Sequence, residues 1–401
     1  MVKRINLIMA SVVLCSQSCF SVLPEFSLFS QLSDGTYCHR VNDLSADGTI
    51  VVGQRTINGY FPMPFWLSKD VGLRDVGNTT YAGVAYGLSP NGTTVVGQIT
   101  NVITEETSAY KWTQADGLIL LGYLGTQTGS YWSSSYGASY DGSIIVGRST
   151  GSNGNEAFLW TASEGMVGLG HLDKNITLGR QSGAYAISAD GSTVVGYSGY
   201  YNLLNGKDIE PFLWNEQRGM IGLGHLPGGD SDGYATCVSS DGSLIAGYSS
   251  SFLGREAFIW REETGIAGLG IPANEGFRST MASRMSADGN IIVGWGHIVD
   301  SHLSEAFIWD EVNGIRNLTN LLENEYGLDL MGWRLRDASG ISDDGKTIIG
   351  WAERIDGAFH EQGYYIVTIP EPSTLLFLSG GFLCLRRIGN KLHKSFGLNC
   401  T

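Results

Sequence analysis

The sequence predicts an all-β protein built from seven copies of one repeat, and three observations carry that prediction. A phrase of the form Ser-x-Asp-Gly, with Asn91 in place of Asp in the second copy, occurs seven times at spacings of 44 to 56 residues, each time followed by an apolar run and a glycine. An aromatic strand follows six of the copies, and a glycine-rich strand follows four of those. A period of this length made of short strands is typical of a β-propeller. We therefore expect seven four-stranded blades, with a β-solenoid or packed β-sheets as the alternative.

The first element of each repeat is the Ser-x-Asp-Gly phrase, for example ISADGSTVVG from Ile187. Asp-Gly between two apolar runs favours the positive φ angles of a type I′ hairpin turn. The serine two residues before the aspartate can bond the turn backbone. Each copy therefore predicts a β-hairpin. The turn glycines are Gly48, Gly92, Gly142, Gly191, Gly242, Gly289 and Gly345.

The second element is the aromatic strand, such as EAFLW from Glu156. In a strand, Phe158 and Trp160 face one way while Ala157 and Leu159 face the other, so both faces are apolar. Strands with one wet face alternate apolar and polar residues, so this one is expected to be covered on both sides, as in a blade between two neighbours. A glycine-rich strand such as GMVGLGHL then completes a unit of four strands.

The ends of the repeat region favour a closed ring. The seventh repeat runs into Pro370 without its fourth strand. The segment Phe26 to Leu32 precedes the first turn phrase as the glycine-rich strand precedes later ones. We expect it to complete the last blade and leave no unpaired edge.

Two further segments flank the predicted propeller of residues 22–369. Residues 1–21 place Lys3 and Arg4 before an apolar run and a small polar stretch, the order of a secretory signal peptide. Residues 370–401 begin with prolines, continue with 11 apolar residues and reach a basic pair. That run is shorter than the roughly 20 residues of a full span, a difference that arginine snorkelling and bilayer thinning reduce. The alternative is a merely amphipathic C-terminal peptide.

Charge and cysteine content narrow the partners. The net charge is −14, and the six basic residues of the two flanking segments leave residues 22–372 with −20. Such a body repels phosphate backbones, so we expect no nucleic-acid partner; neutral glycans or divalent cations suit it better, and solubility alone also explains the charge.

Cys38 and Cys237 fall in the first and fifth repeats, beyond the roughly 7 Å that a disulfide bridges, so both are expected to be free thiols.

These phrases resemble two bacterial families. Ala-Phe-x-Trp, Ser-x-Asp-Gly and Leu-Gly-x-Leu resemble the HAF-type extracellular repeat, although Glu stands where that repeat's name expects His. The C-terminal segment resembles a PEP-CTERM sorting signal, carried by Pro370, Glu371, Pro372, Arg386 and Arg387. The resemblance implies processing by an exosortase-like enzyme, contact with the inner membrane of a Gram-negative bacterium, and a cell-surface or matrix location near exopolysaccharide.

Three sets of polar residues are weighed as sites, and each has a simpler explanation. His171 and His225 share one slot of the glycine-rich strand, which Ile271 fills in another copy, so packing explains them better. Glu156 and its equivalents Glu256 and Glu305 could form a carboxylate ring, but solvated strand ends are commoner. The turn aspartates could bind calcium, but one per repeat makes no cage. We therefore expect no catalytic residue, no metal site and no cofactor.

Aromatic residues outside the repeated slots are the candidates for ligand binding, because loops carry recognition more often than cores do. They are Trp132, Tyr200, Tyr201 and Trp333, with Trp295 as a fifth. Trp295 and Trp351 follow equivalent apolar phrases, which favours packing for both.

The sequence thus favours a non-catalytic binding or structural protein of the surface or matrix, in an exopolysaccharide context. No nucleophile elbow, zinc-binding helix, phosphate loop or dinucleotide fingerprint is present. The alternative is a polysaccharide-acting glycosidase or lyase, whose carboxylates would be scattered around a propeller channel.

Overall fold

The computed structural model describes residues 25–369, except for 30–31, 33–35, 58–60, 79, 126–130, 153, 173–178, 203–205, 230, 300, 302 and 357–358. The predicted signal peptide and sorting signal therefore lie outside the described residues. Within the described ranges, no helix is both long and apolar enough to cross a membrane.

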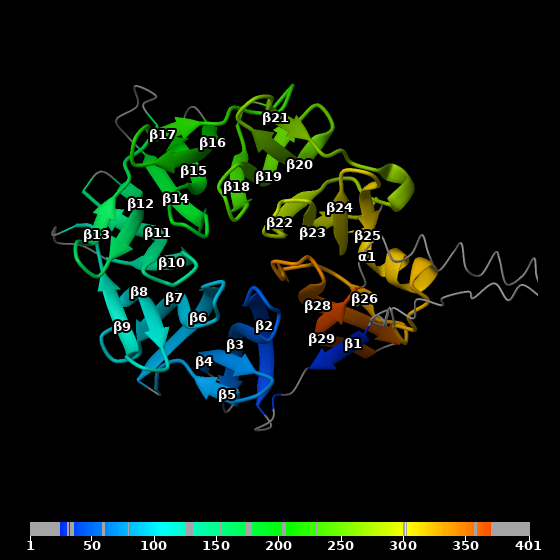
Figure 1. Cartoon of the computed structure of the whole chain (residues 1–401), viewed down its shortest axis with the longest axis horizontal. Coiled ribbons are helices and arrows are strands. Elements are labelled where there is room, and N and C mark those ends of the chain that lie inside the picture. The colour runs from blue at the N-terminus through cyan, green and yellow to red at the C-terminus, as the bar shows by residue number, and fades with distance from the viewer. Residues whose placement is uncertain are drawn as a thin grey trace, which may run out of the picture. The chain divides into compact units, whose positions relative to one another are not determined.

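Antiparallel sheets arranged in a ring make up the molecule (Figure 1). The first sheet holds β2 (Tyr37–Leu44), β3 (Ile50–Ile57), β4 (Phe61–Ser68) and β5 (Gly72–Asp75), and the second holds β6 (Tyr81–Leu88), β7 (Thr94–Asn101), β8 (Thr107–Thr113) and β9 (Gly117–Gly122). The third holds eight strands: β10 (Ser133–Ala138), β11 (Ile144–Gly151), β12 (Gly154–Thr161), β13 (Gly165–Gly168), β14 (Arg180–Ile187), β15 (Val194–Asn202), β16 (Gly206–Asn215) and β17 (Gly219–Gly222).

The remaining sheets continue around the ring. They are β18 (Gly233–Val238), β19 (Leu244–Ser251), β20 (Gly254–Arg261) with β21 (Gly265–Gly268); β22 (Met281–Met285), β23 (Ile291–His297), β24 (Ser304–Asp310) with β25 (Gly314–Asn317); and β26 (Arg334–Leu335), β27 (Gly340–Ile341), β28 (Thr347–Asp356), β29 (Phe359–Thr368) with β1 (Glu25–Phe29). Short helical turns lie at η1 (Ala273–Glu275), α1 (Leu318–Asn320) and η2 (Leu321–Glu325).

The prediction of an all-β propeller made of small antiparallel sheets is confirmed, and the solenoid alternative is wrong because the ring closes. Closure uses the N-terminal segment as predicted: β1 pairs with β29, from Glu25 opposite Thr368 to Phe29 opposite Tyr364. The described strands form six hydrogen-bonded sheets, one fewer than the seven separate ones predicted. The difference arises at one parallel pair, Asn155 with Gln181, which joins two four-stranded meanders into the eight-stranded sheet.

A closed circle of backbone hydrogen bonds links the seven turn phrases. In each repeat the residue after the turn serine bonds its equivalent in the next repeat. The bonds run from Ala46 to Pro90, Tyr140 to Ala189, Ala189 to Ser240, Ser240 to Ala287, Ala287 to Asp343 and Asp343 back to Ala46, at 2.8 to 3.0 Å. Pro90 has no N–H, and Asn91 donates to Tyr140 instead, at 3.3 Å. The residue after the turn serine thus closes the ring through its backbone. Its side chain takes no part in these bonds and varies among the repeats.

The turn itself differs from the predicted type I′ hairpin. Gly48 has a φ of +70°, whereas Asp47 is not among the described non-glycine residues with positive φ. A type I′ turn needs positive φ at both central residues, so the prediction is wrong. The loop is wider: Gly48 N–H donates to the Ser45 carbonyl, and Asp47 accepts hydrogen bonds from the Ser45 hydroxyl, at 2.6 Å, and from the Thr49 N–H. The same serine-to-carboxylate bond recurs in every repeat, with Asn91 as acceptor in the second.

The aromatic strand lies in the core as predicted. The side chains of Phe158, Phe212, Phe258 and Phe307 are fully buried, and Tyr365 takes this position in the last repeat. Each sheet is therefore covered on both faces by its neighbours.

Candidate functional site in the central channel

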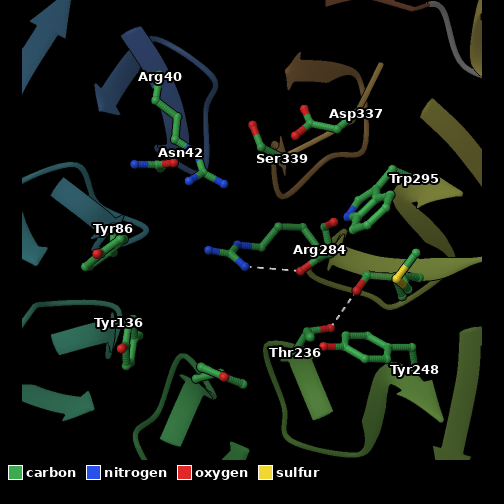
Figure 2. A pocket seen from close by; sticks show the side chains of 14 residues that line it. Arg40, Asn42, Tyr86, Tyr136, Thr236, Tyr248, Arg284, Trp295, Asp337 and Ser339 are labelled. Carbon is green, nitrogen blue, oxygen red and sulfur yellow. Dashed lines mark hydrogen bonds between the residues drawn. The ribbon is translucent and has the colours of Figure 1, made fainter. Parts of the chain in front are cut away.

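A β-bulge in the innermost strand of six repeats aims one side chain at the centre of the ring. The register of β2, β6, β10, β14, β18 and β22 shifts at the residue three positions before the turn serine. A bulge leaves its extra residue unpaired and redirects its side chain. The residues at this position are Asn42, Tyr86, Tyr136, Tyr185, Thr236 and Ser283, with Ser339 as the equivalent in the last repeat. All seven line one cavity of about 330 Å³ (Figure 2).

Three of the bulged side chains tie adjacent repeats together. The Asn42 amide donates to the Ala85 carbonyl at 2.6 Å, and the Thr236 hydroxyl donates to the Ala282 carbonyl at 2.8 Å. The Ser339 hydroxyl donates to the Val41 carbonyl at 2.9 Å, across the closure of the ring. Each accepting carbonyl lies directly before the next repeat's bulge. Short polar side chains at this position therefore have a structural role.

The three bulged tyrosines make no such bond within the described part of the chain, and they begin an aromatic arc along the channel. Ring centroids are 5.3 Å apart for Tyr86 and Tyr136, and 5.4 Å apart for Tyr136 and Tyr185. The arc continues through Tyr197, Tyr234 and Tyr248 at 5.1 to 5.4 Å. We call these six residues the tyrosine arc; all of them except Tyr197 and Tyr234 line the cavity.

Burial raises the pKa of three members of the tyrosine arc. It raises the pKa of Tyr86 and of Tyr185, and it raises the pKa of Tyr248 to about 12. These three phenol groups are protonated at neutral pH and can donate hydrogen bonds.

Charged groups lie on the other side of the cavity. Figure 2 shows the Arg284 side chain extending into its middle, with Asp337 and Arg40 on neighbouring elements. Arg284 Nη1 donates to the Ser283 carbonyl at 3.1 Å, and its Nε is 3.7 Å from Asp43 Oδ1. Burial raises the pKa of the Asp337 carboxyl to about 6, although the Trp351 N–H and Arg40 favour its charged form. Asp337 is thus a carboxyl group that titrates near neutral pH at a cavity wall.

The structure distributes the aromatic candidates from the sequence unevenly. Trp132 lies under Arg148, whose guanidinium carbon is 4.5 Å from its ring centroid, and Arg148 in turn donates to the Tyr197 hydroxyl at 2.6 Å. Trp132 therefore extends the tyrosine arc. Tyr200 is half-buried in β15, and the side chain of Tyr201 lies outside the described residues.

The tryptophans of the last two repeats divide between the core and the cavities. Trp333 is only 6% exposed and packs in a hydrophobic cluster, with Arg354 over its ring. Trp295, a candidate whose repeat position favoured packing, lines the cavity and is half-buried. Trp351 lines a smaller cavity of about 200 Å³ beside it. Trp295 lies on β23 and Trp351 on β28. Each of these strands is the second of its repeat and lies next to the innermost strand, so side chains near the bulged position reach the channel.

The glutamates and histidines of the repeat are structural. Glu156 and Glu256 each accept the N–H of a glycine in the Leu-Gly-x-Leu strand, from Gly170 and Gly270, both at 2.9 Å. Glu256 is 7% exposed, so it is neither a member of a carboxylate ring nor a solvated strand end. His171 Nε2 lies 3.1 Å from the Asn155 carbonyl oxygen.

The remaining Glu305 forms a hydrogen bond with the side chain of Asn317. His225 lies 3.6 Å from an Asp208 oxygen. Both contacts are structural.

Metal and thiol chemistry have little support in the described ranges. No group of three or more His, Cys, Asp or Glu residues placed to hold a metal ion occurs there. Cys38 and Cys237 are free, as predicted, and buried. Burial raises the pKa of Cys38 to about 12 and that of Cys237 to about 11, so neither is a reactive thiolate.

The bulged position, which holds most of the candidate site, is not among the residues that the sequence motifs single out. A signal was present: the third residue before the turn serine is polar in all seven repeats, whereas the residue directly before that serine is always apolar. A side chain that breaks the apolar pattern of an innermost strand marks a channel position.

Comparison with known proteins supports the fold. No family model matches the chain, and no curated protein matches it. An oligogalacturonate lyase from Vibrio parahaemolyticus is similar over 87% of this chain and 98% of its own, at 13% identity and a TM-score of 0.55. A prolyl endopeptidase is similar over 86% of this chain and 51% of its own, at 10% identity and a TM-score of 0.54.

A TolB protein from Acinetobacter baumannii is similar over 68% of this chain and 66% of its own, at 12% identity and a TM-score of 0.42. The fold and the channel together define a β-propeller protein with an aromatic and polar central cavity. At these identities the lyase and the endopeptidase show the fold alone.

Proposed function

We propose that this chain is an exported, seven-bladed propeller that binds exopolysaccharide at the bacterial surface or in the matrix without cleaving it. The count of seven takes the two meanders of the eight-stranded sheet as separate blades. The observation that carries the binding function is the tyrosine arc at the channel cavity.

Aromatic rings and neutral phenols suit a carbohydrate ligand. A sugar offers an apolar C–H face to an aromatic ring and hydroxyl groups to nearby donors and acceptors, and pockets of this kind combine aromatic walls with few polar groups. Tyr86, Tyr136 and Tyr185 supply both features without a hydrogen-bond partner of their own in the described part of the chain. The ring of hydrogen bonds holds them in place, which lowers the entropy lost on binding.

The surface location rests on the two flanking segments. We infer export through residues 1–21 and processing or anchoring of residues 370–401 by an exosortase-like membrane enzyme. The described chain ends beside the last turn phrase, where the Ile369 N–H donates to the Lys346 carbonyl at 2.8 Å. Deletion of residues 370–401 tests this part: we expect loss of surface retention and of processing, and unchanged retention would refute it.

Binding is tested with the full chain, purified in detergent, and the producing organism's own exopolysaccharide. Size-exclusion chromatography with light scattering should show the protein eluting with intact polymer. The variant Tyr136→Ala should elute apart from the polymer. Tyr140→Ala is the matched control, because Tyr140 is 51% exposed at a turn and lies outside the cavity. Equal co-elution of both variants would overturn the role of the arc.

The second candidate is an enzyme that acts on polysaccharide. Asp337 favours it, since a carboxyl group with a pKa of about 6 at a cavity wall suits general acid or base catalysis. One similar structure is an oligogalacturonate lyase, although at 13% identity. Polymer that shortens with time in the same experiment, and stays intact with Asp337→Asn, would establish this candidate in place of the first.

A further inference from the structure

The channel cavity holds two guanidinium groups inside an acidic body. Residues 22–372 have a formal charge of −20, yet Arg40 and Arg284 line the cavity together with Asp337, and Asp43 lies beside Arg284. Below a pH of about 6, the pKa of Asp337, that carboxylate also becomes neutral. Two guanidinium groups within a negative surface select small or terminal anionic groups, because long-range repulsion opposes the approach of an extended polyanion along the outside.

The Arg284 guanidinium is held in place with donors to spare. Ser283, the bulged residue before it, accepts one hydrogen bond from Nη1, and Asp43 lies beside Nε. Asp43 is itself occupied: its carboxylate accepts the N–H groups of Leu44 and Leu88 at 3.1 and 2.9 Å. Of the five N–H donors of a guanidinium, the group keeps several for a ligand. Figure 2 shows it reaching across the cavity toward Tyr86 and Tyr136.

Arg40 supplies the second cation. Its side chain is exposed, borders two adjoining cavities and forms no side-chain hydrogen bond with any described residue. Guanidinium groups bind carboxylates through two parallel hydrogen bonds and also stack on flat rings. Two such groups opposite an arc of tyrosines form a site for a ring that bears a carboxylate.

We propose that the cavity binds a terminal uronate unit of a polysaccharide or oligosaccharide, with its carboxylate on Arg284 and Arg40 and its ring against the tyrosine arc. This inference rests on the proposed polysaccharide-binding function and names its sugar class. A cavity of about 330 Å³ lies at the lower end of the range for small-molecule sites, about 300 to 1,000 Å³, so it admits one or two sugar units. The proposed ligand differs from the neutral glycans or divalent cations that the surface charge favours.

Isothermal titration calorimetry of the full chain in detergent tests this inference with three probes: tetragalacturonate, tetramannuronate and neutral cellotetraose. We expect at least one uronate to bind roughly tenfold tighter than cellotetraose, since hydrogen bonds to charged groups exceed neutral ones by about 1 kcal/mol or more. Arg284→Gln should remove that preference by lowering the affinity for the uronates. Arg284→Lys, which keeps the charge beside Asp43, controls for folding. Arg218→Gln is the matched control, because Arg218 is exposed and paired with Glu262 away from the cavity.

The outcomes separate the two levels of the proposal. Equal affinity for all three probes, or a uronate preference that survives both Arg284→Gln and Arg40→Gln, overturns the uronate inference and leaves polysaccharide binding intact. No binding of any probe, together with no co-elution with exopolysaccharide, overturns both. A preference lost in Arg284→Gln and kept in Arg218→Gln supports the site.

Discussion

Replacing one turn serine tests whether the Ser-x-Asp-Gly phrase stabilises the propeller as the hydrogen bonds indicate. The Ser239 side chain is 1% exposed; its hydroxyl donates to Asp241 Oδ1 at 2.7 Å and accepts the Leu244 N–H at 2.9 Å. Ser239→Ala leaves that N–H without its partner, a loss of about 1 to 3 kcal/mol. The bond to Asp241 adds less than 1 kcal/mol, because Asp241 is exposed and solvent screens it. We expect a destabilisation of about 2 kcal/mol.

Urea unfolding, followed by tryptophan fluorescence, measures this loss. The control is Ser243→Ala in the same turn: Ser243 is exposed, and its hydroxyl donates only to Asp241, at 2.8 Å. We expect the control to lose less than about 0.5 kcal/mol. Equal unfolding midpoints for the two variants would refute the assignment of stability to the buried serine.

The stability difference between the wild-type protein and Ser239→Ala should also depend on pH. The hydrogen bond from Ser239 is the largest of the effects that hold the pKa of Asp241 below its ordinary value. A depressed carboxyl pKa stabilises the folded state above the unfolded pKa of about 3.9, and that contribution is lost as the pH falls through the folded value. The difference between the wild-type protein and Ser239→Ala should therefore be larger at pH 6 than at the lowest pH that keeps both folded. A difference that grows on acidification would contradict this reasoning.

Three further predictions use other parts of the repeat. Gly247→Ala should destabilise the protein by about 3 kcal/mol or prevent folding, since a Cβ there would lie 1.9 Å from the Tyr234 carbonyl oxygen. Gly125→Ala should cost little, because no atom lies closer than 3.6 Å to a Cβ at that position. Equal melting temperatures for the two variants would refute this prediction. Glu256→Ala should lower stability by about 1 to 3 kcal/mol by leaving a glycine N–H unbonded, and Glu256→Gln, which keeps an acceptor, should lose much less. Asp337→Asn should raise the melting temperature at pH 8 and not at pH 4. A carboxyl pKa raised to about 6 makes the folded state lose stability as the pH rises from the unfolded pKa of about 3.9 through 6. Calorimetry at both pH values measures the effect, and an equal gain at both would contradict it.

The sequence predicted the ring because the features that build it repeat. The spacing and the aromatic strand recur along the chain, and the strand at Phe26 supplies the one that the seventh repeat lacks. The repeats can therefore be compared with one another within a single sequence. The turn type was wrong for a local reason: Asp-Gly is compatible with several loops, and Asp47 pairs with Ser45 in a loop wider than type I′. Residue preferences rank turns, but the hydrogen bonds across the loop decide among them.

The candidate site could not be predicted in the same way, since it depends on register. A strand read with a period of two places Tyr185 on a face of its sheet, and only the bulge between Ala184 and Ala186 turns that side chain toward the channel. Bulges have no single residue signature. Glu256 illustrates the opposite error: its repeated position suggested a site, but its partner is a backbone N–H of its own repeat, which only the folded glycine-rich strand brings near.

The two kinds of position have different freedom to vary, and this separates folding from function in the repeat. The turn serine and its acceptor satisfy buried backbone groups in every copy, so the fold constrains them. The bulged residue satisfies no strand pairing. Asn42, Thr236 and Ser339 bond the next repeat, and where the residue is tyrosine the ring closes without that bond. The backbone circle at the turns supplies enough closure to make the bulged bonds dispensable in part. Substitutions at the bulged positions can therefore change the channel lining while the ring persists, so Tyr136→Ala should alter ligand binding far more than stability.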